Sequence, residues 1–494
     1  MTRRRSHLLL RPILLCLLAL LAAPLDAQSP TTPPGPVVLA EPIVTRHHGS
    51  FNGRSVAYTA RVEPLMVSGA DGRPAARLVT ISYVADAPAR PAGRPVLFIF
   101  NGGPIASSTM LHMGAFGPRR VAVPDDLKAD PAKFRLVDNN YTLLDVADLV
   151  FFDPAGTGFS RIADGVDPAS QFSNIADSRQ LAQLVLEWCR ANGRMESPKY
   201  LIGESYGTLR APEAARQLAS EGASLEGIVL LGQAVNIVEY SQRPLNLISY
   251  VVSLPTLAAT AWELGKGEPR GRSFDRFVND ARNFAAGEYL GLLFLGDTAP
   301  AARREAAARR LQEFTGLSAD WYLAHALRIT KTDYQRMLIP GSRLATNDSR
   351  YVGPADGPDP MAGLFQAYQD RFAEYLRDDL KAGGIGDYSQ LSPFTGGLNG
   401  WDWGPNKSPF GDWPYGRAIN DLMTANPHFR ILVANGWTDT QTTVGAMDYL
   451  VSQSGWPRDR VRTATYRGGH MAYTIEASLK RLTDDVRAMV TGKW

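Results

Sequence analysis

The feature that most constrains this chain is a serine between two glycines, where a predicted strand meets a predicted helix. Residues 199–203 (KYLIG) are mostly apolar, and residues 208–222 (TLRAPEAARQLASEG) have helical character. The pentapeptide G-E-S-Y-G between them fits the nucleophile elbow G-x-S-x-G, a strained turn that presents a serine. An ordinary Gly-rich turn is the alternative, since the chain contains 45 glycines. The flanking elements favour the elbow, with Ser205 as the nucleophile.

Other apolar runs indicate that this strand belongs to a parallel sheet. Strands buried on both faces read as near-continuous apolar runs, and helical segments separate several of them here. An Asp-Gly pair at residues 71–72 joins two alternating β segments upstream, which predicts an antiparallel leading edge. The sequence therefore predicts an α/β fold with a mostly parallel central sheet. The apolar runs are residues 95–100, 147–153, 199–203, 227–232 and 430–436.

Composition divides the chain into five segments. Arginines precede an apolar run at the N-terminus and a small residue, Ala27, fits a cleavage site, which predicts a signal peptide rather than an uncleaved anchor. A long stretch of mixed helices and Gly/Pro-rich loops interrupts the α/β pattern, which predicts a largely helical insertion in the position of a lid. The predicted segments are the signal peptide 1–27, a Pro-rich linker 28–40, the first core part 41–235, the insertion 236–415 and the second core part 416–494.

Charge and cysteine content exclude several classes of protein. Four arginines and one aspartate leave with the signal peptide, so the formal net charge of +3 falls to 0. Without a basic stripe, we expect no nucleic-acid partner, and we expect no membrane association after signal removal. Cys189 is the one cysteine left after cleavage, so we expect a buried thiol and no internal disulfide. No metal-ligand cluster is recognisable, and we expect no cofactor.

A serine nucleophile needs a base, which in α/β-hydrolases follows the acid along the chain. Three histidines follow Ser205, at positions 325, 428 and 470. His470 lies in a Gly-rich loop before the last predicted helix, where this architecture places its base. The alternative for His470 is a solvated loop histidine.

The acid should lie just beyond the strand that follows the insertion. Asp439, in N-G-W-T-D after the run 430–436, fits that place and can orient the imidazole. The alternative for Asp439 is a helix N-cap. Asp448, inside the following helical segment, fits a solvated helix face.

The oxyanion of a tetrahedral intermediate needs two backbone donors. We expect one from Tyr206, directly after the nucleophile, and the other from Gly103 in the loop after the run 95–100. The alternative for that loop is a plain β-turn.

Five motifs in order resemble the serine carboxypeptidase family over residues ~95–490. They are Asn-Gly-Gly-Pro at 101–104, Asp-Pro-Ala-Gly-Thr-Gly-Phe-Ser at 153–160, Gly-Glu-Ser-Tyr-Gly at 203–207, Gly-Trp-Thr-Asp at 436–439 and Gly-His-Met at 469–471.

The resemblance implies an α/β-hydrolase that removes residues from the C-termini of peptides or proteins. It further implies that Glu204, Asn101 and Gly102 bind the substrate's terminal carboxylate. Two carboxylates at hydrogen-bond distance repel, so one must be protonated, which predicts activity favoured at acidic pH. The disulfides common in eukaryotic members are absent, which is consistent with a bacterial-type member. The predicted signal peptide implies export to the periplasm or the exterior.

Three positions depart from the family pattern and weaken the expected carboxylate grip: Ile99, Ile105 and Ala115. An esterase or acyltransferase on the same scaffold is therefore an alternative function, and a non-catalytic binding protein is a third. The preference for the leaving residue and the oligomeric state stay open.

Overall fold

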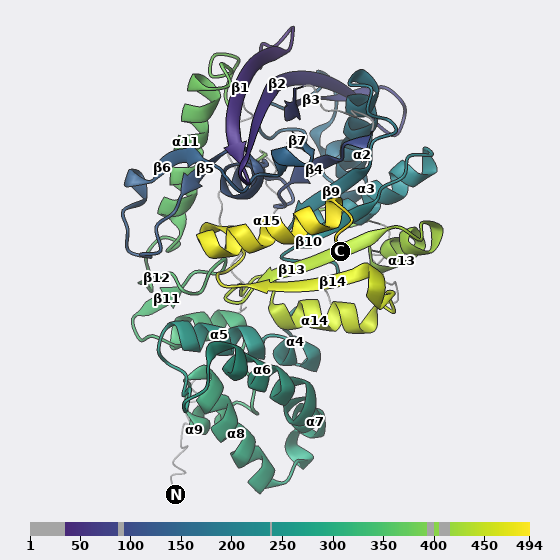
Figure 1. The fold of residues 1–494 in the computed structure, drawn as a ribbon. Coiled ribbons are helices and arrows are strands. Elements are labelled where there is room, and N and C mark those ends of the chain that lie inside the picture. Colours follow the sequence, from purple (N-terminus) through teal and green to yellow (C-terminus); the bar gives the residue numbers. More distant parts are fainter. Residues whose placement is uncertain (1–34, 87–92, 238–239, 393–399, 405–414) are drawn as a thin grey trace, which may run out of the picture.

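The computed structural model has a ten-stranded sheet at its centre, in the order β1-β2-β3-β7-β4-β9-β10-β13-β14, with β8 beside β3 (Figure 1). Among the described residues, no helix combines the length and the apolar character that a membrane crossing requires. The predicted signal peptide and residues 28–34 of the predicted linker lie outside the described part of the chain. The structure describes residues 35–86, 93–237, 240–392, 400–404 and 415–494.

The sheet has an antiparallel leading edge and a parallel body, as the sequence predicts for an α/β-hydrolase. Strands β1, β2 and β3 are antiparallel, and β3 is antiparallel to β7. From β7 to β14 every pair of neighbouring strands is parallel. The strands of the main sheet are β1 (Ile43–Phe51), β2 (Arg54–Ser68), β3 (Pro74–Ala85), β4 (Val96–Phe100), β7 (Asp148–Phe151), β8 (Arg161–Ile162), β9 (Lys199–Glu204), β10 (Gly227–Leu231), β13 (Arg430–Gly436) and β14 (Val461–Tyr466); β5 (Arg119–Ala122) and β6 (Arg135–Asp138) form a separate hairpin.

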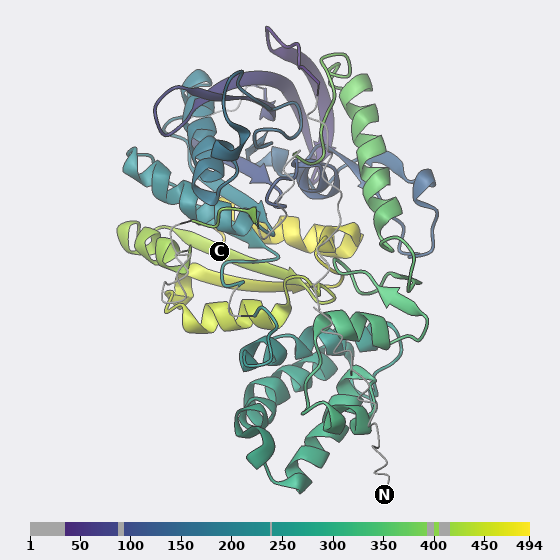
Figure 2. The ribbon, with the colours of Figure 1, turned by 180° about the vertical axis from the view of Figure 1, so that it is seen from behind.

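Each parallel strand buries both of its faces because side chains alternate along it. In β4, Phe98 joins the hydrophobic core on one side of the sheet and Leu97 the core on the other side. Figures 1 and 2 show the helical layers from opposite directions. Cys189, in α2, is buried as predicted. Helices α2 (Asn174–Ala191), α3 (Gly207–Ser220) and α13 (Tyr415–Ala425) cover the first core, and α11 (Ala362–Asp378) and α15 (Glu476–Val490) cover the second.

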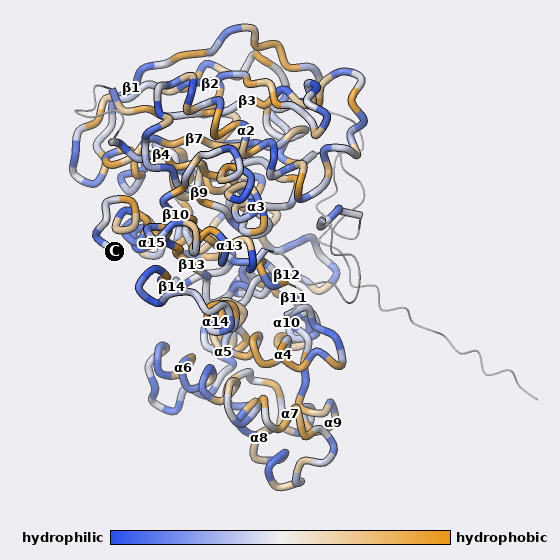
Figure 3. Tube along the Cα trace, turned by 90° about the vertical axis from the view of Figure 1, so that its right-hand side faces the viewer, coloured by the Kyte–Doolittle hydropathy of each residue, from blue (hydrophilic) through white to orange (hydrophobic). Residues whose placement is uncertain are grey.

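The segment predicted as an insertion consists of two differently placed parts. Helices α4 to α10 form a body that packs against the sheet domain through α5 and α14 (Figure 1), with apolar stretches along α5 and α7 (Figure 3). Helix α11 instead returns to the sheet domain, where Phe372 lies edge-on to buried His112 at 4.9 Å between ring centres. Shared aromatic burial therefore ties α11 to the core. The remaining bounds are α4 (Leu247–Val251), α5 (Leu254–Glu263), α6 (Phe274–Phe284), α7 (Leu290–Leu295), α8 (Ala301–Thr315), α9 (Ala319–Ala324), α10 (Lys331–Met337), β11 (Ser342–Leu344), β12 (Val352–Pro354) and α14 (Val444–Gln453), together with the short α1 (Thr109–Leu111).

Candidate active site

Ser205 occupies a strained turn between β9 and α3. Its φ of +58° lies in the left-handed region, which non-glycine residues seldom adopt and which clusters at functional sites. A Cβ on Gly203 would come within 2.4 Å of the carbonyl oxygen of Gly207, so the turn closes only with glycine there. The backbone N–H of Ser205 donates to Leu231 O at 2.8 Å, which ties the turn to the end of β10.

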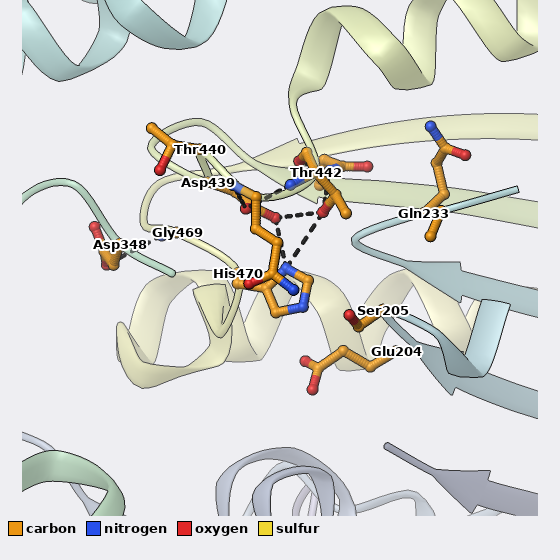
Figure 4. A network of polar contacts seen from close by, with 12 residues as sticks. Glu204, Ser205, Gln233, Asp348, Asp439, Thr440, Thr442, Gly469 and His470 are labelled. Atoms are coloured by element: carbon orange, nitrogen blue, oxygen red, sulfur yellow. Dashed lines mark hydrogen bonds and ion pairs between the residues drawn. The ribbon is translucent and has the colours of Figure 1, made fainter. Parts of the chain in front are cut away.

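His470 and Asp439 meet at the carboxyl edge of the sheet (Figure 4). The imidazole Nδ1 lies 2.7 Å from Asp439 Oδ2, and the Asp439 side chain is buried. Thr442 donates to the same oxygen through its hydroxyl at 2.6 Å, and the N–H groups of Gln441 and Thr442 donate to Oδ1. Helix α14 takes Thr443 as its N-cap, so Asp439 does not cap it. Sequence reasoning missed Thr442.

The imidazole lies close to the serine turn. A Cβ on Gly232 would come within 2.7 Å of His470 Cε1, and Gly232 directly follows Leu231, the acceptor for the Ser205 amide. Figure 4 shows the Ser205 hydroxyl on the side facing the ring. Among the described residues the structure contains no hydrogen bond between Ser205 and His470. Such catalytic contacts are often long in free enzymes and tighten with substrate.

The other two histidines after Ser205 and the second aspartate lie away from this site. His325, next to α9, and His428, before β13, are exposed. Asp448 pairs with Arg282 at 2.7 Å. The position of the last histidine after a Gly-rich loop was therefore the informative signal.

The Asn-Gly-Gly-Pro loop lies against the serine turn. A Cβ on Gly102 would be 2.6 Å from Tyr206 N and 2.9 Å from Ser205 Cβ, so only glycine allows this approach. Gly103 has a φ of +106°, which also favours glycine. The N–H groups of Gly103 and Tyr206 donate to no acceptor in the described part of the chain.

A buried arginine from α3, which sequence reasoning missed, holds this loop. Arg210 donates to the carbonyl oxygens of Asn101 at 2.6 Å and Pro104 at 3.0 Å, and pairs with Asp177 at 2.7 Å. Both charged side chains are buried. Burial raises the pKa of Asp177, and the Arg210 charge acts in the opposite direction. No motif could have indicated Arg210, because a helical arginine ordinarily reads as solvated.

Glu204 is a buried carboxyl with one satisfied oxygen. Asn101 Nδ2 and the Tyr473 hydroxyl, the latter at 3.3 Å, both donate to Oε2. Oε1 has no hydrogen-bond partner in the described part of the chain. Burial raises the pKa of Glu204 to about 7, although His470, Tyr473 and Asn101 each favour the ionised form. Sequence reasoning missed Tyr473.

Electrostatics couple Glu204 to the imidazole. Burial lowers the pKa of His470, but the Asp439 carboxylate outweighs it and, with a smaller contribution from Glu204, the pKa lies above its ordinary value. Glu204 and His470 also line one small cavity. The protonation of either group therefore affects the other.

Residues 82–241 match the family model for serine carboxypeptidases. The matched segment contains Asn101, Glu204 and Ser205, and it ends before Asp439 and His470. The family match therefore covers the nucleophile half of the candidate site, whereas Asp439 and His470 are joined to each other by their hydrogen bond outside the matched segment.

Comparison with solved structures shows that the fold of this chain is similar to that of a known carboxypeptidase. Kex1(delta)p, a prohormone-processing carboxypeptidase from Saccharomyces cerevisiae, has a TM-score of 0.54 at 14% identity, covering 89% of this chain and 92% of that chain. A proline iminopeptidase from Mycobacterium smegmatis has a TM-score of 0.38 at 14% identity, covering 87% and 98%. No curated protein sequence matches the chain.

Proposed function

We propose that this protein is a serine carboxypeptidase in which Ser205 is the nucleophile, His470 the general base and Asp439 the residue that orients the imidazole. The observation that carries the proposal is the hydrogen bond from His470 Nδ1 to buried Asp439, beside the strained turn at Ser205. Because Nδ1 is engaged by the carboxylate, Nε2 is the nitrogen left to accept the serine proton.

The proposed reaction proceeds through an acyl-enzyme. Ser205 Oγ attacks the carbonyl carbon of the last peptide bond while His470 takes the hydroxyl proton. The N–H groups of Gly103 and Tyr206 stabilise the oxyanion, which their lack of other acceptors supports. His470 then protonates the leaving amine, and a water molecule hydrolyses the acyl-enzyme by the reverse proton transfers.

Glu204, Asn101 and Gly102 bind the terminal carboxylate of the substrate in this proposal. The free Oε1 of Glu204 supports the assignment, because a buried oxygen without a partner is costly unless a ligand completes it. A protonated Glu204 donates a hydrogen bond to the substrate carboxylate, whereas an ionised Glu204 repels it.

The sign of the pH dependence follows from Glu204. Its pKa of about 7 means that the neutral, donating form prevails on the acidic side of pH 7. Protonation of Glu204 also removes a negative neighbour of His470, which lowers the imidazole pKa from its raised value of about 9. Cleavage of free C-termini should therefore weaken as pH rises through 7.

Matched peptides with free and amidated C-termini test the proposal, with kcat/KM measured on both sides of pH 7. We expect cleavage of the free peptide, little cleavage of the amide, and a preference that shrinks above pH 7. Equal turnover of both peptides together with rapid ester hydrolysis would favour an esterase or acyltransferase instead.

Export completes the proposed function. The predicted signal peptide, residues 1–27, would direct the chain to the periplasm or the exterior, and 236–415 would form an insertion between the core segments 41–235 and 416–494. N-terminal sequencing of the protein recovered from its native host tests export, with a start near Gln28 expected. An intact Met1 would contradict it.

A further inference from the structure

Buried Asp348, in the loop between β11 and β12, contacts both loops that carry the proposed acid and base. Asp348 Oδ1 accepts a hydrogen bond from the Thr438 hydroxyl at 2.8 Å, and Oδ2 accepts one from the Gly469 N–H at 3.1 Å. Thr438 directly precedes Asp439, and Gly469 directly precedes His470. One carboxylate therefore joins the two loops one residue away from each catalytic side chain, on the left of Figure 4.

Backbone contacts from the same loop reinforce this link. The His470 N–H donates to Asn347 O at 2.5 Å, and the Ser349 N–H donates to Thr438 O at 3.0 Å. A Cβ on Gly469 would come within 2.1 Å of Asn347 O, so the histidine loop packs directly on this loop. The segment 347–349 thus fixes both loops by backbone as well as by side chain.

An arginine holds the Asp348 carboxylate in place. Arg350 Nε lies 3.0 Å from Oδ1 and 3.1 Å from Oδ2, and a second guanidinium nitrogen also donates to Oδ2. Burial lowers the pKa of Arg350, but the Asp348 carboxylate more than compensates, so the arginine stays charged. The Arg350 backbone N–H also donates to Oδ1 at 3.2 Å, and the two loops supply one further donor to each carboxylate oxygen.

We propose that Asp348 is a positioning residue that sets the distance between the acid and histidine loops and so aligns the imidazole with Ser205. The inference rests on the proposed function, because the aligned group is the proposed base. Asp348 contacts no reacting atom and acts through Thr438 and Gly469. A misplacement of about 1 Å in such a site can cost roughly 100-fold in rate.

The test compares Asp348→Asn, Thr438→Val and the double variant by kcat and KM on a free C-terminal peptide, with active sites titrated. We expect kcat to fall about 10- to 100-fold for Asp348→Asn with KM within about twofold, and less for Thr438→Val. The kcat of the double variant should be only slightly lower than that of Asp348→Asn, because both substitutions break the same link between Asp348 and Thr438.

Asp148→Asn is the matched control for losing a buried ion pair. Asp148 is buried, pairs with Arg94 at 2.7 Å and with Arg194, and accepts the Ala85 N–H at 3.1 Å. Asp148 is the first residue of β7, so it lies at the amino ends of the parallel strands, whereas the candidate site lies at their carboxyl ends. Asp148→Asn should lower thermal stability while kcat per titrated site stays unchanged.

The outcomes separate this inference from the proposed function. Full activity in Ser205→Ala would overturn the proposed function. With Ser205→Ala inactive, wild-type kcat per titrated site in Asp348→Asn would overturn the positioning role alone. If Asp348→Asn does not fold, Thr438→Val decides: an unchanged kcat overturns the proposal, and a lowered kcat with unchanged KM supports it.

Discussion

The two halves of the candidate site are each held by an Asp–Arg pair with a buried carboxylate, used in opposite ways. In the nucleophile half, Arg210 donates to the carbonyls of the loop beside Ser205. In the histidine half, Asp348 accepts from the donors of the two loops that carry Asp439 and His470. A cation thus fixes loop carbonyls on one side, and an anion fixes loop donors on the other.

The difference between the halves is one of chain distance. The serine turn depends on contacts between β9, α3 and the loop after β4, all within the segment 82–241 that matches the family. The histidine half needs β11–β12, β13 and β14, which are far apart in the chain. The nucleophile half should therefore tolerate changes in residues 236–415, which contain β11 and β12, and the histidine half should not.

Asp439→Asn is the largest perturbation of this comparison. An amide cannot stabilise the imidazolium and can hold the imidazole in the wrong tautomer, so we expect kcat to fall about 10⁴-fold. Asp448→Asn is the matched control, since its carboxylate pairs with Arg282 outside the site. Peptide hydrolysis under saturating substrate measures both, and an equal effect of the two variants would contradict the assignment of Asp439.

Arg210→Met removes the hydrogen bonds that hold the Asn101–Pro104 loop in the nucleophile half. The change leaves Asp177 buried without its partner, so we expect a loss of about 3–5 kcal/mol in the free energy of unfolding. Burial already raises the pKa of Asp177, so in the variant this penalty should shrink as pH falls and the carboxyl protonates.

Urea unfolding at two pH values measures this effect, with Arg270→Met as the control. Arg270 is exposed and pairs with Glu268 at 2.9 Å and with Glu313 at 3.4 Å, and its loss should destabilise the protein far less than the loss of Arg210. Equal losses in the free energy of unfolding for the two variants would contradict a stabilising role of Arg210 in the nucleophile half.

Glu204→Gln removes the titrating group from the proposed binding site for the substrate's terminal carboxylate. In the wild type, kcat/KM for a free C-terminus should fall about tenfold per pH unit well above the Glu204 pKa of about 7, since only the neutral form donates. Glutamine stays neutral, so the variant should lack this fall. The pH profile measures it, and a profile that keeps the wild-type midpoint would assign the titration to another group.

Tyr473→Phe is the smallest and sharpest change. The Tyr473 hydroxyl donates to the Glu204 carboxylate, and this hydrogen bond lowers the pKa of Glu204. Without it the pKa should rise, and the alkaline fall in kcat/KM should move to higher pH, with a rate change of about fivefold or less. Tyr368→Phe is the control, because its buried hydroxyl has no partner in the described part of the chain. A downward shift would contradict the contact.

The sequence predicted the parts of this molecule that depend on local pattern. Apolar runs indicated the parallel strands, and Gly203 indicated a turn that has no room for a Cβ at that position. Asp439 and His470 could be proposed as acid and base from the sequence because each follows a predicted strand. Their joining by a hydrogen bond needed the structure.

The parts that the sequence did not predict depend on tertiary contacts. Asp348 lies in a loop whose polar residues read as an ordinary turn, and only the packing of two distant loops gives it a partner. Arg210 and Tyr473 are common residue types without a spacing signal. Helix α11 has an ordinary amphipathic pattern, and such a pattern does not specify whether its apolar face packs on the sheet domain or on helices α4 to α10.

Fluorophosphonate labelling followed by peptide mass mapping tests the central claim most directly. The reagent reacts with a serine that an imidazole activates, so wild-type protein should carry one label, on Ser205. Ser205→Ala should take up none, and Asp439→Asn should react far more slowly, while Asp448→Asn should label at the wild-type rate. Labelling that persists in Ser205→Ala, or a rate that is independent of Asp439, would contradict the account.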